Sequence, residues 1–356
     1  MRERMYIQAA RALSAQNGFM DDALPSLLTE PVDNLFYFPT IDYSRWFSIM
    51  QLRRMSRLTR AGMAVAIETL RDAALDKPDA IITGTGKGSL GDTEKFMESV
   101  RVHVEGTLNP SPFIQSTYNA LNGLIGLHQD VDSYNTTYVH RGFSLEHAIQ
   151  DAQLLFHEGA AANALVGSVE EMTAEHFGIK KKLGYWKTAP VRREDILTDQ
   201  QPGAVAGEGC FFFAFAKQPN DKTLATLRDL QLLFEPTSAT LLQTIDDMLS
   251  AAHLAPADID VVITGRNGDW RHDHYYDAVS ALFPRATECC FKQLSGEFDT
   301  AAGFGLWLAA KMLSAPQEIP AAVARQGGAV SRPVKNLLMY NSYYGVQHSL
   351  YLLEGR

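Results

Sequence analysis

Residues 134–144 follow the order of a nucleophile elbow. A β-rich segment ending near Tyr138 leads through a sharp turn at Gly142 into a helical pattern that reaches Gly159. In α/β enzymes such a turn presents a reactive side chain to substrate, and the unpaired N–H groups at the helix start lower the pKa of a thiol held there. The tip of this turn carries Val139, which has no nucleophilic atom. We therefore expect an elbow that lacks a nucleophile.

The remaining thiols and imidazoles form no clear second site. Cys210, Cys289 and Cys290 have neither a disulfide framework nor a C-x-x-C metal spacing, and their apolar neighbours predict buried, unreactive thiols. His140 adjoins the turn, and the segment 272–274 places two imidazoles beside a carboxylate, but no third ligand follows at a useful spacing. We expect no metal, an exposed polar loop at 272–274, and an interface or turn-shaping role for His140.

Length and composition favour a large folded protein. The chain has 356 residues, 46% of them hydrophobic, which is enough for one large or two fused domains. A net charge of −9 argues against a nucleic-acid partner and against an anionic membrane surface. No apolar run approaches ~18 residues, so we expect no membrane span, no signal peptide and a reduced cytoplasmic setting. The basic run 180–182 predicts a solvated loop face.

The hydrophobic pattern divides into two successive α/β halves. A polar break at 218–221 separates residues 1–219, which contain the elbow at 137–142, from residues 220–356. Their similar order predicts an α/β, layered fold built by internal duplication. We expect helices at 63–70, 114–128, 239–252 and 277–283, and strands at 6–10, 80–84, 164–171, 207–215, 227–234, 259–264, 336–341 and 349–353.

Motifs along nearly the whole chain resemble those of the β-ketoacyl synthases of fatty-acid and polyketide assembly. Their shared order, rather than any one motif, carries the resemblance, and it implies a thiolase-like αβαβα fold. The matching segments are 53–57, Gly84-Thr85-Gly86, Ser111-Pro112-Phe113, Gly142 of the elbow, Glu208-Gly209, Lys292 with Gly296, and Asn341-Ser342.

The resemblance also indicates where the chemistry has been lost. In that family a cysteine takes the acyl chain, and two histidines assist decarboxylation and stabilise the developing oxyanion. The cysteine position falls on Val139, and the two histidine positions fall on Gly265 and Glu297. The final loop keeps Asn341 but loses most of the family's glycines, which implies a stiffer loop. The residues similar to retained active-site positions are Gly142, Glu208, Lys292, Gly296 and Asn341.

A synthase scaffold without its catalytic groups resembles the chain length factor, the non-catalytic partner of an iterative synthase. The resemblance implies no cofactor of its own, a heterodimer with a catalytic ketosynthase, a phosphopantetheinylated acyl carrier protein that delivers substrate, and a tunnel whose depth limits chain length. Tyr118 is closest to the position that limits depth. The candidates for tunnel or interface are Phe113, Ser116, Thr117, Tyr118, Tyr138 and His140, and ordinary packing of the interface helix remains open for them.

The segments 5–8 and 84–96 look especially similar to synthase-like subunits of aryl polyene and flexirubin-type pigment clusters. Two other functions stay open at this point. One is a divergent condensing or acyl-transfer catalyst that uses His140, Glu297 or the loop at His272. The other is a stand-alone module that binds an acyl carrier protein.

Overall fold

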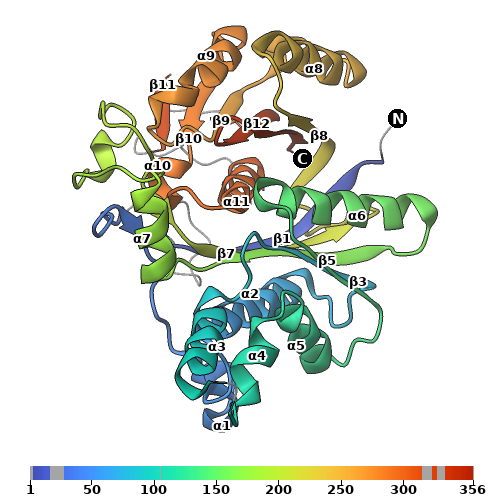
Figure 1. Cartoon of the computed structure of the whole chain (residues 1–356). Helices are drawn as coiled ribbons and strands as arrows, with labels where there is room; N and C mark the ends of the chain where they lie inside the picture. Colours follow the sequence, from blue (N-terminus) through green and yellow to red (C-terminus); the bar gives the residue numbers. More distant parts are fainter. Residues whose placement is uncertain (1–2, 17–27, 105, 315–322, 327–332, 356) are drawn as a thin grey trace.

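Figure 1 shows the computed structural model of the chain, which describes residues 3–16, 28–104, 106–314, 323–326 and 333–355. The strands are β1 (Met5–Leu13), β2 (Leu35–Phe36), β3 (Ala80–Gly84), β4 (Tyr134–Tyr138), β5 (Asn163–Glu170), β6 (Ala206–Gly207), β7 (Gly209–Ala216), β8 (Ala225–Phe234), β9 (Val261–Thr264), β10 (Thr287–Cys290), β11 (Ala324–Gln326), β12 (Asn336–Tyr343) and β13 (Gln347–Glu354). The α-helices are α1 (Ile49–Leu52), α2 (Arg57–Ala73), α3 (Leu90–His103), α4 (Pro110–Ser116), α5 (Ala120–Gln129), α6 (Ser144–Glu158), α7 (Ala174–Lys182), α8 (Ser238–Ala251), α9 (Asp273–Leu282), α10 (Lys292–Ser295) and α11 (Ala302–Ser314).

Two sets of strands repeat the same topology. The hydrogen-bonded order is β11-β10-β9-β12-β13-β8-β1-β7-β5-β3-β4. In the first set β3 runs parallel to β4 and β5, while β7 is antiparallel to β5 and β1. In the second set β9 runs parallel to β10 and β12, while β13 is antiparallel to β12 and β8. The repeated order is the duplicated α/β arrangement expected from the sequence, and residues 219 and 220 fall between β7 and β8.

The elements stack in five layers. In Figure 1, α6 and α11 lie between the two sets of strands, with α2 to α5 outside the first set and α8 and α9 outside the second. Helix α11 is buried from Ala302 to Leu313 and contacts β1, β7, β9 and β12, which belong to both sets. A helix that is apolar on every side must be enclosed, so α11 forms the centre of the core. The layered αβαβα prediction is confirmed.

The strands inside this core are apolar on both faces. Strand β7 carries four phenylalanines between Phe211 and Phe215 because helices or loops cover each side of it. Cys210 lies in the same strand, and Cys289 and Cys290 lie in β10, all three buried as expected. Burial raises the pKa of the Cys290 thiol to about 12, so it stays protonated and unreactive at neutral pH.

Two local expectations were wrong. The helix predicted over 114–128 is divided into α4 and α5, because Thr117 adopts an extended conformation. The hydroxyls of Ser116 and Thr117 donate to the carbonyls of Phe113 and Ile114, which satisfies the end of α4 without further helix. The basic run 180–182 is also helical, and its first lysine is buried. Within the described residues, no helix is long and apolar enough to span a membrane.

Gly84 fixes the distance between β3 and the elbow helix. A Cβ atom at this position would lie 2.5 Å from the backbone nitrogen of Leu145 and would also meet the backbone of Ser144. We expect Gly84→Ala to lower the free energy of unfolding by about 1–3 kcal/mol or more, because the backbone of α6 must move. Chemical denaturation measures the change.

Gly178→Ala in α7 is the matched control. A Cβ there meets nothing within 4 Å, and alanine favours a helix by up to about 1 kcal/mol over glycine. This variant should be as stable as the natural chain or more so. Equal destabilisation by both substitutions would contradict the packing argument.

Candidate functional site

The turn after β4 has the geometry of an elbow. A short 3-10 turn at Arg141–Phe143 joins β4 to α6, and Arg141 adopts a left-handed φ of 51°. The N–H of Gly142 donates to Gln347 Oε1 at 2.9 Å, and a Cβ atom at Gly142 would lie 2.5 Å from Tyr343 Cβ. The glycine therefore lets the final loop pack directly on the turn.

The tip of the elbow carries no nucleophile. Val139 is 43% exposed and precedes the turn, whereas the left-handed conformation falls two residues later, on Arg141. The sequence did not reveal this shift, because backbone strain has no signature in residue type. An arginine guanidinium stays protonated in proteins and cannot attack a thioester. Neither residue supplies the thiol that this position requires in a condensing enzyme.

Glu297 forms a buried ion pair with Lys292. Both side chains are fully buried, and Lys292 Nζ lies 2.7 Å from Glu297 Oε2. Asn267 Nδ2 donates to the same oxygen at 2.7 Å, and Lys292 Nζ also donates to the Ser342 carbonyl at 3.0 Å. Burial raises the pKa of Glu297 and lowers the pKa of Lys292, so removal from water outweighs their mutual attraction. The Lys292 and Glu297 predicted from the sequence thus meet, while Asn267 was missed.

Two neighbouring side chains crowd the position of Gly265. Gly265 directly follows β9, and a Cβ atom there would lie 2.5 Å from Asn341 Oδ1 and 3.2 Å from the Tyr276 hydroxyl. Tyr276 Oη donates to the Gly265 carbonyl at 2.7 Å. Asn341 and Tyr276 therefore occupy the volume that a side chain at this position would need. The sequence pointed to Asn341 but gave no signal for Tyr276.

Two further residues that the sequence motifs indicated, Glu208 and Gly296, hold backbone segments together. Glu208 accepts the N–H groups of Phe38 and Met172, each at 3.0 Å, and pairs with Arg57 at 2.9 Å. Gly296 has a φ of 75°, and a Cβ atom there would lie 2.7 Å from the backbone nitrogen of Gly207. These contacts give Glu208 and Gly296 structural roles beside the elbow.

Glu146 adds a second buried carboxyl group near the elbow. It lies in the first turn of α6, fully buried, and accepts a hydrogen bond from Ser349 Oγ at 2.9 Å. Burial raises its pKa to about 7, with hydrogen bonding and the charge of Lys292 opposing the change. The interior next to Lys292 therefore holds two acidic groups with raised pKa values, Glu146 and Glu297.

The histidines near the elbow contact one another rather than a nucleophile. His140 Nδ1 lies 2.9 Å from His147 Nε2, and the two rings stack 5.1 Å apart on the surface. The expectation of an exposed polar loop at 272–274 is wrong: a 3-10 turn ends at His272, and the next two residues begin α9. His272 is half-buried against Gly345, and burial lowers its pKa. Among the described residues, no three His, Cys, Asp or Glu side chains are placed to hold a metal.

The tunnel candidates lie at the surface of the isolated chain. Phe113 and Tyr118 are both more than half exposed. Thr117 and Tyr118 line a cavity of about 20 Å³ together with Thr83, Thr85 and Ser89, which is room for about one water molecule. The Tyr118 ring lies against Gly88, 2.8 Å from where a Cβ would stand. Tyr138 and His140 do not line this cavity, although the Tyr138 carbonyl accepts the N–H of Thr85 at 3.0 Å.

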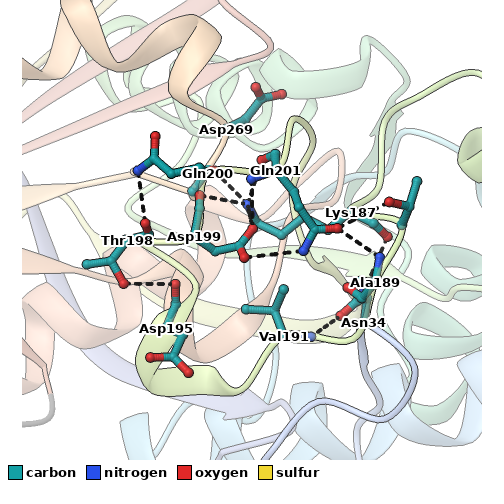
Figure 2. A network of polar contacts seen from close by, with 12 residues as sticks. Asn34, Lys187, Ala189, Val191, Asp195, Thr198, Asp199, Gln200, Gln201 and Asp269 are labelled. Atoms are coloured by element: carbon teal, nitrogen blue, oxygen red, sulfur yellow. Dashed lines mark hydrogen bonds and ion pairs between the residues drawn. The ribbon is translucent and has the colours of Figure 1, made fainter.

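Figure 2 shows a polar network that fixes the loops beside the site. Lys187 is fully buried, and its Nζ donates to Asp199 Oδ1 at 3.1 Å, to the Gln201 carbonyl at 2.9 Å and to the Gly268 carbonyl at 3.0 Å. Asn34 binds the carbonyl of Lys187 at 2.9 Å and so attaches the segment before β2. Because Lys187 is fully satisfied by protein acceptors, this network is structural.

The comparisons with known proteins agree with this architecture. Residues 39–189 match the family model described as "Beta-ketoacyl synthase, N-terminal domain". A search of curated proteins finds no match.

Several solved structures share the fold over the whole chain. A β-ketoacyl synthase from Burkholderia phymatum STM815 has a TM-score of 0.81 at 15% identity, covering 99% of this chain and 100% of that one. "The ishigamide ketosynthase/chain length factor" has a TM-score of 0.77 at 15% identity, with both chains fully covered. The ketosynthase ApeO in complex with its chain length factor ApeC, from Xenorhabdus doucetiae, has a TM-score of 0.78 at 16% identity, covering 99% of this chain and 98% of that one. These identities are low, so the matches show the thiolase-like ketosynthase fold.

The buried pair Lys292–Glu297 predicts strong coupling between its members. Glu297→Leu should lower the free energy of unfolding by about 3–5 kcal/mol, because it leaves the Lys292 ammonium buried without its counter-charge. The double variant Lys292→Met with Glu297→Leu should cost less than the sum of the single changes. A double-mutant cycle by chemical denaturation measures the coupling.

The exposed pair of Lys77 and Asp130 has the same separation, 2.7 Å, and serves as the control. Lys77→Ala should change the free energy of unfolding by no more than about 1 kcal/mol, because water screens this pair. Additive costs at Lys292 and Glu297 would refute the coupling.

Proposed function

We propose that this chain, a ketosynthase-like protein with the thiolase-like fold, is a non-catalytic chain length factor. In this role it forms a heterodimer with a catalytic β-ketoacyl synthase and shapes the tunnel that receives the growing acyl chain. The partner supplies the cysteine and both histidines. A phosphopantetheinylated acyl carrier protein delivers the substrate to that partner.

The observation that carries the proposal is that other contacts occupy both of the proposed histidine positions, Gly265 and Glu297. Glu297 is engaged by Lys292 and Asn267, and the position of Gly265 is closed by Asn341 and Tyr276. A carboxyl group in a buried ion pair neither polarises a thioester carbonyl nor stabilises an oxyanion as an imidazole does. Together with Val139 at the cysteine position, this arrangement favours a scaffold that assists chemistry performed elsewhere.

An exposed apolar surface supports association with a partner. The side chains of Met97, Val102, Phe113, Ile114 and Tyr118 lie exposed on or next to the packed helices α3 and α4, and we call them the α3–α4 apolar face. Exposed apolar side chains concentrated in one region of a protein are typical of interaction sites. This face includes two of the tunnel candidates, Phe113 and Tyr118.

The edge of the sheet adds a second contact surface. In the described part of the chain β4 is the last strand of the order and pairs only with β3. Its outer edge presents free N–H and C=O groups, which are a template for pairing with another chain. Tyr138 is the last residue of this strand and His140 follows it, so the strand and the elbow are available to the same partner.

Two structural neighbours are named as ketosynthase and chain length factor pairs, and one of them is the ApeO and ApeC complex. Those names describe the neighbours. For this chain we extend the proposal to pigment assembly of the aryl polyene type, on the resemblance of segments 5–8 and 84–96 to subunits from such clusters.

The alternative of a divergent catalyst would have to use His140, Glu297 or His272. His140 is exposed and bound to His147, Glu297 is held in the buried pair, and His272 packs on Gly345. None of these contacts favours a reactive group at the elbow. A stand-alone module that binds an acyl carrier protein would need no synthase partner, so the association experiment separates it from the proposal.

The first test is co-expression with a ketosynthase that contains the cysteine and both histidines and is encoded beside this chain. We expect a one-to-one complex by size-exclusion chromatography with light scattering. Ile114→Asp should break it, because a charge in the α3–α4 apolar face must be desolvated on association.

Phe234→Asp, at a comparably exposed phenylalanine at the end of β8, should leave the complex intact. A stable homodimer that ignores the ketosynthase would refute the proposal. A one-to-one complex that tolerates Ile114→Asp would exclude the α3–α4 apolar face as its contact surface.

The second test concerns chain length. We expect Tyr118→Ala to lengthen the products of the reconstituted complex, because removal of the ring opens the small cavity between Gly88 and Thr117. Mass spectrometry of the product pool, with and without this chain, measures the effect. Tyr134→Ala removes another exposed tyrosine that does not line the cavity, and it should leave product length unchanged. Unchanged length in an intact Tyr118→Ala complex would exclude Tyr118 as the limit.

A further inference from the structure

Helix α7 buries a lysine that has no hydrogen-bonding partner. Lys180 is only 7% exposed, and its Nζ atom has no acceptor among the described residues. Four aromatic rings surround it, with Nζ between 5.2 and 5.9 Å from each ring centre. These rings belong to Tyr185, Trp186, Tyr343 and Tyr344. A desolvated ammonium group gains attraction from such rings, but its three N–H donors remain unsatisfied.

Lys187 provides a contrast within the same region. It is at least as deeply buried, but its ammonium group donates to Asp199 and Gln201, which are labelled in Figure 2, and to the carbonyl of Gly268. Buried charged groups are ordinarily satisfied in this manner. Lys180 lacks such hydrogen bonds, although Lys187, only seven residues later in the chain, has them.

Other unsatisfied donors gather around Lys180. The buried atoms Trp186 Nε1, Tyr344 Oη and His176 Nε2 have no partner among the described residues. Trp186 and Tyr344 belong to the ring set around Nζ, and His176 precedes Lys180 by four residues, on the same face of α7. The Lys180 ammonium group and the Trp186 indole N–H can only donate, whereas the Tyr344 hydroxyl and a neutral imidazole can also accept. None of these atoms is hydrogen-bonded to another in the described structure, so the two obligate donors lack an acceptor.

The carboxylates of this region are engaged elsewhere. Asp299 accepts a hydrogen bond from the Tyr343 hydroxyl at 2.8 Å and lies 3.8 Å from Lys87 Nζ. Glu297 Oε2 is bound by Lys292, although its Oε1 is free of hydrogen bonds. Burial lowers the pKa of Lys180, and the charges of Asp299 and Glu297 oppose that change. Neither carboxylate forms an ion pair with Lys180 in the described structure, so its charge lacks a direct counter-ion.

We propose that Lys180, Trp186, Tyr344 and His176 bind a small carboxylate. The donors require an acceptor-rich ligand, and one ammonium group is neutralised by one negative charge. Flat aromatic walls favour a planar group over a tetrahedral one, and the neighbouring Asp299 and Glu297 disfavour a dianion such as phosphate. Tyr344 is partly exposed, although its Oη atom is buried.

This site is independent of the proposed role as a chain length factor. It lies within one chain and needs neither a ketosynthase nor an acyl carrier protein. Its failure would leave the heterodimer proposal untouched, and failure of the heterodimer would leave this site untouched.

The test is binding of acetate to the isolated full chain by calorimetry, with thermal unfolding as a second readout and chloride added to keep ionic strength constant. We expect acetate to bind and to raise the unfolding midpoint. Lys180→Met removes the charge of the side chain and keeps much of its volume. Trp186→Phe removes the indole N–H donor and part of the indole ring. Lys180→Met should weaken acetate binding by about tenfold or more, and Trp186→Phe by several-fold.

The controls test charge, shape and position. Acetamide has the planar shape without the charge, and inorganic phosphate is tetrahedral, so each should bind more weakly than acetate. Lys181→Met, at the next residue of α7, should bind acetate as the natural chain does. The proposal is overturned if acetate does not bind, if phosphate or acetamide binds equally well, or if both Lys180→Met and Trp186→Phe bind acetate normally. Should Lys180→Met fail to fold, Trp186→Phe alone decides the outcome.

Discussion

The close approach of two backbones, one from each half of the chain, is the constraint on which this structure depends. A Cβ atom at Gly207 would lie 3.0 Å from Gly296 Cα, and one at Gly296 would lie 2.7 Å from the nitrogen of Gly207. Glu297 N–H donates to the Val205 carbonyl at 2.8 Å, and Gly207 N–H donates to the Glu297 carbonyl at 3.1 Å. Only residues without a side chain allow this contact. The contact carries Glu297 into the interior, where a lysine must balance its charge.

The ion pair of Lys292 and Glu297 follows from this contact between Gly207 and Gly296. Lys292 and Glu297 lie on either side of the turn at Gly296, so the turn that joins the halves also brings the two charges together. Asn267 and the Ser342 carbonyl complete the set of hydrogen bonds from two other loops. A buried pair satisfied in this way fixes the loops around it, because loss of either charged partner leaves an uncompensated charge and loss of a neutral partner leaves a buried polar atom unsatisfied. The region is rigid for reasons of electrostatics as well as packing.

Much of the fold could be predicted from the sequence because apolar periodicity reports burial directly. Strands such as β7 and β12, and the order of elements in both halves, follow from that pattern. The division at Thr117 could not be predicted, since it depends on hydroxyl groups that satisfy the end of α4. Lys180 was missed for a different reason. A run of three lysines indicates a solvated face on composition alone, and burial of its first member depends on rings from distant segments.

The motif order led to Val139, Gly265 and Glu297 as the proposed catalytic positions, and that correspondence remains a proposal. The contacts of the site, such as the left-handed Arg141 and the crowding by Tyr276, required coordinates. The tight space at Gly265 has a consequence if Gly265 corresponds to the first histidine of the family, as proposed. A histidine reintroduced there would collide with Asn341 unless that residue and Tyr276 changed as well. Under that correspondence, reversal of this one position would require coordinated changes in three elements: the loop after β9, β12 and α9.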